Sequence, residues 1–214
     1  LSSGNWAPVI VRDNVLFDND ATYGGGFYVY DTPVYIADNQ LVENAATTAG
    51  GAFYLDYYTS ATVLNNTIVG STCYGTGSGF HIASYNNDLL ANNVIAHSTN
   101  GEGIYTTDSS SRVQMVHNDV YDHADGGYGG YFADQTGRHG NLSVDPVFTA
   151  YSFNGDLADD DLTLQAGSPL SDAGAPGFLD ADGTVSDLGF GGGDDEMTAP
   201  AGYDIAVSQL GNGD

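Results

Sequence analysis

The sequence predicts an all-β chain that coils into a solenoid, and two observations support this prediction. Five asparagines recur at intervals of 25, 27, 27 and 25 residues, at Asn14, Asn39, Asn66, Asn93 and Asn118. A period of this length indicates a stack of similar units, each of which needs its neighbours to bury its apolar face. The chain also has no lysine and 30 glycines among its 214 residues, and its apolar residues are largely β-branched or aromatic. This composition favours short strands over helices.

Each repeat carries the same features in the same order. A branched aliphatic residue follows the asparagine by two positions, a glycine pair or near-pair comes later, and an aromatic or apolar run ends the repeat. Neighbouring strands lie about 4.8 Å apart, so equivalent residues of stacked coils should form columns. In such a column a buried asparagine amide can donate to one neighbour and accept from the other. We therefore predict a single-stranded parallel β-helix of about seven coils over residues 1–193, with a tail or cap over residues 194–214.

Within this frame, glycines should occupy one corner of each coil, where a positive φ is needed. The aliphatic residues that follow the asparagines should form one internal stack, and Phe27, Phe53 and Phe80 should form an aromatic one. Cys73 is the only cysteine, which argues against a disulfide framework, and we expect it to be a buried apolar filler.

The formal charge of −25 excludes nucleic acid and anionic membrane surfaces as favoured partners. No stretch of 18 apolar residues is present, so we expect no membrane insertion. The first residues already read as part of a coil rather than as a signal peptide. We interpret the chain as a mature or truncated portion of an exported protein and expect an extracellular or cell-surface location.

Two stretches, Leu16–Tyr28 and Leu41–Phe53, resemble the repeat of right-handed parallel β-helix proteins, including the polymorphic outer-membrane adhesins. Three later stretches, 141–148, 168–174 and 180–189, look like the closing coils of large bacterial secreted β-helix proteins. The resemblance implies the fold and its right-handed coil. It does not imply an activity, because adhesins, lyases and glycosidases share this architecture.

Carboxylates around a glycine turn form the most site-like pattern. Asp180, Asp182 and Asp187 flank Gly183 and could converge on a hard cation such as Ca²⁺. The turn is not an EF-hand loop, since the fifth-position ligand and the distant glutamate are missing. An Asp/Gly turn whose carboxylates accept backbone N–H groups is the equal alternative. Asp172 and the acidic residues at 194–196 are weaker candidates as extra ligands.

A second cluster has residue types suited to acid–base or metal chemistry: His117, Asp119, Asp122, His123, Arg138 and His139. However, His123 occupies a repeat position that is polar in every coil, which accounts for it structurally. Polysaccharide lyases of this fold resemble one another in needing a Lys or Arg beside calcium, and this chain has only three arginines. Most of the motifs of polygalacturonase-like glycosidases are also missing.

We therefore expect a secreted or cell-surface, non-catalytic β-helix module for adhesion, extracellular matrix or filament assembly, with structural calcium. The alternative is a carbohydrate-active enzyme, a polysaccharide lyase or glycoside hydrolase of the pectate-lyase-like fold. Expected partners are a glycan or another surface protein, and an open solenoid end near Arg12 invites head-to-tail self-association. A glycan could stack on exposed rings at Tyr57, Tyr58, Tyr74 and Tyr85.

Overall fold

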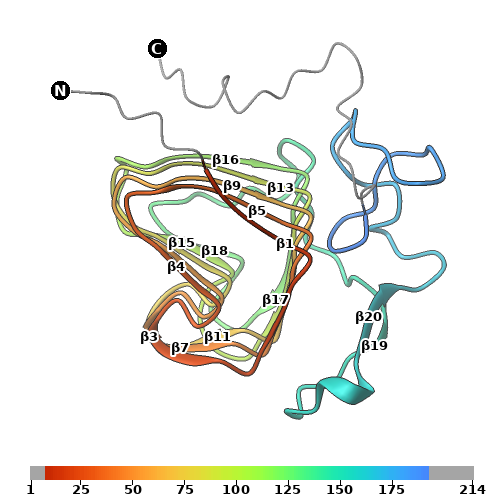
Figure 1. Cartoon of the computed structure of the whole chain (residues 1–214), viewed down its shortest axis with the longest axis horizontal. Helices are drawn as coiled ribbons and strands as arrows, with labels where there is room; N and C mark the ends of the chain where they lie inside the picture. The colour runs from red at the N-terminus through yellow and green to blue at the C-terminus, as the bar shows by residue number, and fades with distance from the viewer. Residues whose placement is uncertain (1–7, 193–214) are drawn as a thin grey trace.

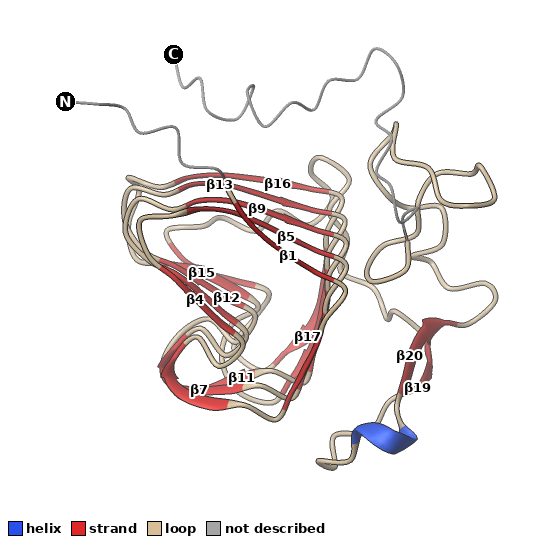
Figure 2. Ribbon diagram, in the orientation of Figure 1, coloured by secondary structure: helices blue, strands red, loops and turns tan. Residues whose placement is uncertain are grey.

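The computed structural model describes residues 8–192, which form a right-handed parallel β-solenoid of about five turns with a long segment beside it (Figure 1). The predicted fold class is confirmed. Figure 2 shows that strands and loops make up nearly all of this region, with one short 3₁₀ turn, η1, at Leu157–Asp159. The tail predicted over residues 194–214 lies outside the described residues.

Four parallel sheets form the walls of the solenoid, and each turn contributes at most one strand to each sheet. The first sheet contains β1 (Val9–Arg12), β5 (Pro33–Ala37), β9 (Ser60–Leu64), β13 (Asn87–Ala91) and β16 (Arg112–Val116). The second sheet contains β2 (Val15–Phe17), β6 (Gln40–Val42), β10 (Thr67–Val69), β14 (Val94–Ser98) and β17 (Asp119–His123). The third sheet has β3 (Asp20–Tyr23), β7 (Ala45–Ala49) and β11 (Thr72–Cys73). The fourth has β4 (Phe27–Val29), β8 (Phe53–Leu55), β12 (Phe80–Ile82), β15 (Ile104–Thr106) and β18 (Tyr128–Gly130).

The repeated asparagines form the predicted column between the first and second sheets. The backbone N–H and the side-chain Nδ2 of Asn39 both donate to Oδ1 of Asn66, over 3.0 and 2.9 Å. Asn66 donates in the same way to Asn93, and Asn118 donates to Asn141, which extends the ladder by one member. Because these amides are buried, the ladder supplies hydrogen bonds that water cannot reach.

Left-handed backbone conformations shape two corners of each turn. The residue before each of the five asparagines from Asn14 to Asn118 has φ between 50° and 59°, and the glycine corner also has positive φ. Short polar side chains tolerate this region better than most residues, and glycine adopts it freely. The residues concerned are Asp13, Asp38, Asn65, Asn92 and His117 at the ladder corner, and Gly24, Gly50, Gly77, Gly101 and Gly126 at the other.

The core of the solenoid consists of columns of like side chains. Ring centroids lie 5.0 Å apart between Phe27 and Phe53, and 4.5 Å apart between Phe53 and Phe80, which confirms the predicted aromatic stack. The aliphatic column is also buried from Leu41 to Val120, with Leu16 of the first turn partly buried, and Cys73 is fully buried. Val9 in the first turn is 51% exposed, because no described turn covers it. Val15 lies on the outer face of the second sheet and is 53% exposed.

The coil count differs from the expected seven, because residues 142–192 leave the solenoid after about five turns. This stretch, called here the docking segment, runs along the outside of the second sheet (Figure 1). Its strands β19 (Phe148–Ala150) and β20 (Asp161–Leu164) pair antiparallel with each other. Of the expected closing coils at 141–148, 168–174 and 180–189, the first pairs with the solenoid through one parallel bridge between Leu142 and Asp119. None of the three adds a strand to the four parallel sheets.

An apolar outer face explains the path of the docking segment. Val42, Val69 and Val94 of the second sheet are fully buried, under a cluster that includes Phe148, Leu170 and Leu188. Polar contacts fix the register of this packing. The carboxylate of Glu43 accepts hydrogen bonds from the backbone N–H groups of residues 154 and 155, at 3.2 and 2.9 Å. Burial of this apolar area offsets the loss of further coils.

Candidate functional sites

The six acid–base candidates do not converge on one point. Asp122 lies beside His97, a residue that sequence reasoning did not select. Arg138 and His139 lie in an exposed turn at the C-terminal end of the solenoid, where the carbonyl of His139 accepts the backbone N–H of His117 over 3.0 Å. The Nδ1 atom of His117 itself lies 2.9 Å from the carbonyl oxygen of Ala173 in the docking segment.

The other two candidates occupy structural positions. His123 is held between the hydroxyl of Ser78, 3.2 Å from Nδ1, and the carbonyl of Ile95, 3.0 Å from Nε2. Burial lowers the pKa of His123 to about 4, so the ring is neutral at pH 7. Asp119 is fully buried, and its Oδ1 accepts the backbone N–H of Val144 over 2.9 Å. Burial raises the pKa of Asp119 to about 7. Both residues therefore serve packing in the described structure.

The structure gathers a carboxylate cluster that differs by one residue from the expected set. Asp172, Asp180 and Asp187 each offer an oxygen, and these oxygens lie within 4.8 Å of one another. Asp182 instead accepts the backbone N–H and the hydroxyl of Thr184, at 2.8 and 2.7 Å. Partial burial and the neighbouring carboxylates raise the pKa of Asp180. Such crowding of like charges favours either a proton or a cation.

Outward-facing aromatic residues form a ladder on the fourth sheet. The rings of Tyr28, Tyr54, His81 and Tyr105 follow one another at centroid distances of 5.3, 4.9 and 5.3 Å. Each stacked pair stabilises the fold by about 0.5–1.5 kcal/mol beyond its buried area. Most faces of these rings are covered by the next ring, whereas Tyr28 in the first turn is 52% exposed. The ladder is therefore mainly structural, with one open end at Tyr28.

A second group of tyrosines lies where the chain leaves the fourth sheet. Tyr57, Tyr58 and Tyr85 are 38%, 54% and 50% exposed, and their ring centroids lie 4.5 to 5.4 Å apart. The ring of Tyr57 stands at 80° to the other two. The carboxylate of Asp56 accepts the backbone N–H of Tyr57 over 2.8 Å and the phenol O–H of Tyr28 over 2.6 Å. These five residues, Tyr28, Asp56, Tyr57, Tyr58 and Tyr85, are called here the tyrosine surface.

Of the four tyrosines singled out from the sequence, only Tyr74 stays apart. It is 78% exposed and belongs to no ring pair within residues 8–192. The tyrosine surface therefore combines ring faces at two orientations with a fixed carboxylate. Aromatic faces beside hydrogen-bonding groups suit a ligand that is apolar on its faces and polar on its edges.

A pocket of about 830 Å³ opens between the second sheet and the docking segment. His97 and Asp122 lie at equivalent positions of adjacent turns, and His97 Nδ1 is 3.0 Å from Asp122 Oδ2. The ring of His97 stacks on Tyr151 at a centroid distance of 5.7 Å. Asp145 and Phe153 also line this space, which is called here the dyad pocket. The spacing of 25 residues between His97 and Asp122 equals one repeat, and this was the signal available in the sequence.

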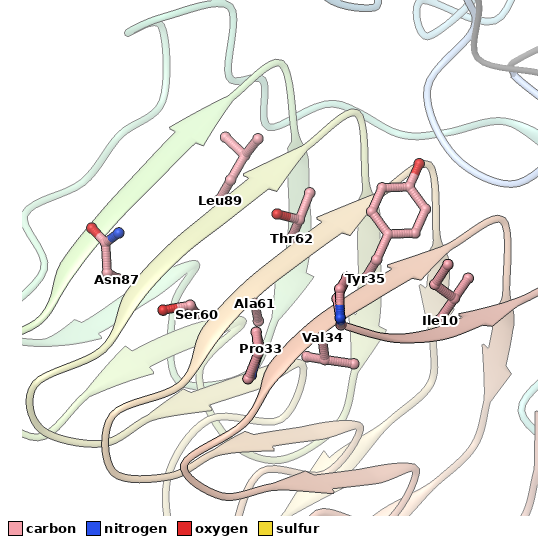
Figure 3. Close-up of a pocket in the computed structure, with 10 residues that line it drawn as sticks. Ile10, Pro33, Val34, Tyr35, Ser60, Ala61, Thr62, Asn87 and Leu89 are labelled. Atoms are coloured by element: carbon pink, nitrogen blue, oxygen red, sulfur yellow. The ribbon is translucent and has the colours of Figure 1, made fainter. Parts of the chain in front are cut away.

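A smaller pocket of about 330 Å³ lies on the outer face of the first sheet (Figure 3). Ile10, Tyr35, Thr62 and Leu89 form one wall across successive strands, and no charged side chain lines the pocket. Burial raises the pKa of Tyr35 to about 12, so its phenol stays neutral. This pocket offers apolar contact area and no acid–base or metal chemistry.

Comparison with known proteins identifies the family of this chain. Residues 2–139 match the family described as "Periplasmic copper-binding protein (NosD)", which is more than half of the chain. The chain belongs to the NosD family. No curated protein and no solved structure matches it. The match covers the solenoid and ends before the docking segment, so NosD membership agrees with the parallel β-helix resemblance and does not extend to residues 140–214.

The described residues do not gather a set of ligands that copper prefers. Copper prefers imidazole and sulfur ligands. Cys73 is fully buried, and the rings of His117 and His123 are engaged by protein groups, as described above. Within residues 8–192, the one group of three potential ligands consists of carboxylates alone, which suit hard cations. No helix in the same region is long and apolar enough to cross a bilayer.

Proposed function

We propose that this protein is an exported, non-catalytic β-solenoid that acts as an adhesion module and binds a neutral glycan on the tyrosine surface. The observation that carries this proposal is the exposed group of Tyr57, Tyr58 and Tyr85 beside the fixed carboxylate of Asp56. Sugar rings present C–H faces to aromatic rings and hydroxyls to carboxylates. Export agrees with the description of the NosD family as periplasmic.

Charge selects the class of glycan. With a formal charge of −25, the protein repels uronic-acid and sulfated chains unless cations intervene. Neutral chains bring no such penalty. The dispersal of the acid–base candidates, with His123 and Asp119 buried, supports binding without turnover.

The test is affinity electrophoresis against a panel of neutral and acidic polysaccharides. Replacing Tyr57, Tyr58 and Tyr85 together by alanine should weaken retention on a neutral polysaccharide at least tenfold, since stacking is worth about 1 kcal/mol per ring. Tyr74→Ala is the matched control, because it removes an exposed tyrosine elsewhere. Retention lost equally in Tyr74→Ala, or seen only on acidic polysaccharides, would contradict the proposal. Product release during incubation would favour the enzymatic alternative.

Structural calcium is the second part of the proposal, at Asp172, Asp180 and Asp187. Three carboxylate oxygens within 4.8 Å support it, together with the raised pKa of Asp180. Calcium would join the 172 turn to the 180–187 turn within the docking segment. Millimolar calcium should raise the melting temperature of the protein. Asp187→Asn should abolish this rise, because asparagine still accepts the hydrogen bond from the Asp172 N–H but lacks the negative charge. Asp182→Asn should leave most of the rise, and an unchanged melting temperature with calcium would rule out the site.

Self-association is proposed at one end of the solenoid only. The first turn leaves β1, β2, β3 and β4 as edge strands, with Val15 half exposed. At the opposite end, Phe132 packs against the core. Lysine on an edge strand discourages pairing, so Val15→Lys should remove any concentration-dependent species in sedimentation velocity. Persistence of that species in Val15→Lys would place the contact elsewhere.

A further inference from the structure

We propose that the dyad pocket binds a small organic cation that carries an alkylammonium group. This site is separate from the tyrosine surface. The NosD match includes its solenoid side, with His97 and Asp122, and ends before the lining residues of the docking segment. The inference rests on four features of the pocket: aromatic walls, carboxylates without a balancing Lys or Arg, two neutral polar side chains that are already engaged, and a strained backbone residue.

Aromatic rings surround the space on the side of the docking segment. Phe148, Tyr151 and Phe153 line the pocket, and Tyr151 carries the stacked ring of His97. Phe153 is 53% exposed and therefore available to a ligand. Ring faces attract ammonium groups through their quadrupole, by about 0.5–1 kcal/mol at exposed sites and more when water is excluded.

The charges of the pocket select a cation. Asp122 and Asp145 line it, and none of its lining residues is lysine or arginine. The whole chain adds to this negative potential. Asp122 is 65% exposed at its side chain while it holds His97, and Asp145 lies exposed on the docking segment. An anionic ligand would meet only repulsion here.

Two neutral polar side chains of the pocket are already used by the protein, and the hydroxyl of a third, Tyr151, is buried without a hydrogen-bond partner. The hydroxyl of Ser98 donates to the carbonyl of residue 100 over 2.8 Å, and Nε2 of Gln165 donates to the carbonyl of Phe148 over 2.8 Å. The carboxylates therefore remain the main polar contacts for a ligand. A transition metal would find a single imidazole there, that of His97, which is too few nitrogen donors for a copper site.

Backbone strain marks the same place. Val147 lines the pocket with φ of 55°, and a β-branched residue in this region is an outlier. Its N–H donates to Asp145 Oδ1 and its carbonyl accepts the N–H of Gln165, each over 2.9 Å. Such strain, about 1–3 kcal/mol, persists where surrounding contacts impose it and is concentrated at ligand sites. The hydrogen bond from Val147 holds one oxygen of Asp145, which lines the same pocket.

Isothermal titration calorimetry with choline and cadaverine tests the proposal, the first as a quaternary and the second as a primary ammonium probe. At least one should bind with one-to-one stoichiometry, and its affinity should fall as salt rises. Dimethylbutanol, the uncharged carbon analogue of choline, should bind at least tenfold more weakly than the better probe. If neither cation binds saturably, or the alcohol binds as well, the proposal is overturned.

Two variants localise the binding. Asp145→Asn keeps the acceptor for the Val147 N–H and removes the charge, so it should weaken binding about tenfold. Phe153→Ala removes an exposed ring and should weaken binding about threefold to fivefold. Asp156→Asn is the matched control on the same segment, outside the pocket, and should bind as the unmodified chain does. Equal affinities of Asp145→Asn and Asp156→Asn would overturn the assignment, and near-UV circular dichroism shows that each variant is folded.

Discussion

Asp88 places a carboxylate inside the solenoid, and its removal should change how stability depends on pH. It is 2% exposed and faces inward in the column of Val34, Ala61 and Val113, which belong to or pack against the core. Its Oδ1 accepts the backbone N–H of Ala61 over 2.8 Å and the hydroxyl of Thr59 over 3.2 Å. Its Oδ2 is buried and has no hydrogen-bond partner. Ionisation of this group is therefore unfavourable in the fold.

The magnitude follows from the pKa. Burial raises the pKa of Asp88 from 3.8 to about 7, and each pKa unit corresponds to about 1.4 kcal/mol. The folded state therefore holds a proton between pH 4 and 7 that the unfolded state has lost. The contribution of Asp88 to the free energy of unfolding is fully present below pH 4 and lost as the pH rises to about 7, a total of about 4 kcal/mol.

Urea unfolding of the chain and of Asp88→Asn, followed by circular dichroism at several pH values from 4.5 to 8, measures this effect. Asparagine keeps the acceptor for Ala61 and Thr59, although its unpaired N–H groups add a constant penalty of about 1–3 kcal/mol. The slope of the free energy of unfolding against pH is the readout. Over this pH window, the slope for Asp88→Asn should correspond to about one fewer proton released on unfolding than the slope for the unmodified chain.

Asp20→Asn is the control, because Asp20 is an exposed carboxylate on β3. Its slope should equal that of the unmodified chain. Carboxylates with a lowered pKa, such as Asp161, titrate below the window and do not disturb it. Identical slopes for Asp88→Asn and the unmodified chain would refute the assignment of the pH dependence to this buried group.

Three further predictions concern other parts of the fold. Asp119→Asn should also flatten the pH dependence, because the raised pKa of Asp119 makes its stabilisation disappear as the pH rises from 4 to about 7, and the same urea series measures it. Asn66→Ala should lower the free energy of unfolding by about 3 kcal/mol or more, since it leaves buried donors of Asn39 without an acceptor. Asn14→Ala, at the open end, should lower it by about 1 kcal/mol. Equal losses in the two variants would contradict the assignment of this stability to the ladder. Val147→Asn should raise the melting temperature by relieving the positive φ, equivalent to about 1 kcal/mol, and a lower melting temperature would show that no strain is stored there.

The repeat determined most of the solenoid, because a constant interval converts sequence spacing into columns. Asn39, Asn66 and Asn93 are equivalent by spacing alone, and a parallel coil offers their amides one another as partners. The same reasoning placed Phe53 over Phe80 and glycine at the left-handed corner. The pairing of His97 with Asp122 was also within reach, since one repeat separates them.

Where the coils stop was decided by the tertiary structure. The outer residues Val42, Val69 and Val94 are apolar, so the second sheet has an outer face to bury, and the docking segment covers it in place of further turns. The sequence contained a hint of this outer face, because β6, β10 and β14 each contain two adjacent apolar residues, one of which must point outward. The sequence did not show whether residues 142–192 would form further turns or pack on the second sheet, because this depends on the apolar area that each arrangement buries.

What the sequence alone determined is therefore everything that depends on period: the fold class, the asparagine column and the aromatic core. Only the tertiary structure decided what depends on contacts between segments without a common period. One such contact brings Asp172, rather than Asp182, to Asp180 and Asp187 in the carboxylate cluster. Another is the stacking of His97 on Tyr151. The physical reason is that periodic neighbours are set by the backbone ladder, whereas docked neighbours are set by surface complementarity, which is absent until the solenoid has formed.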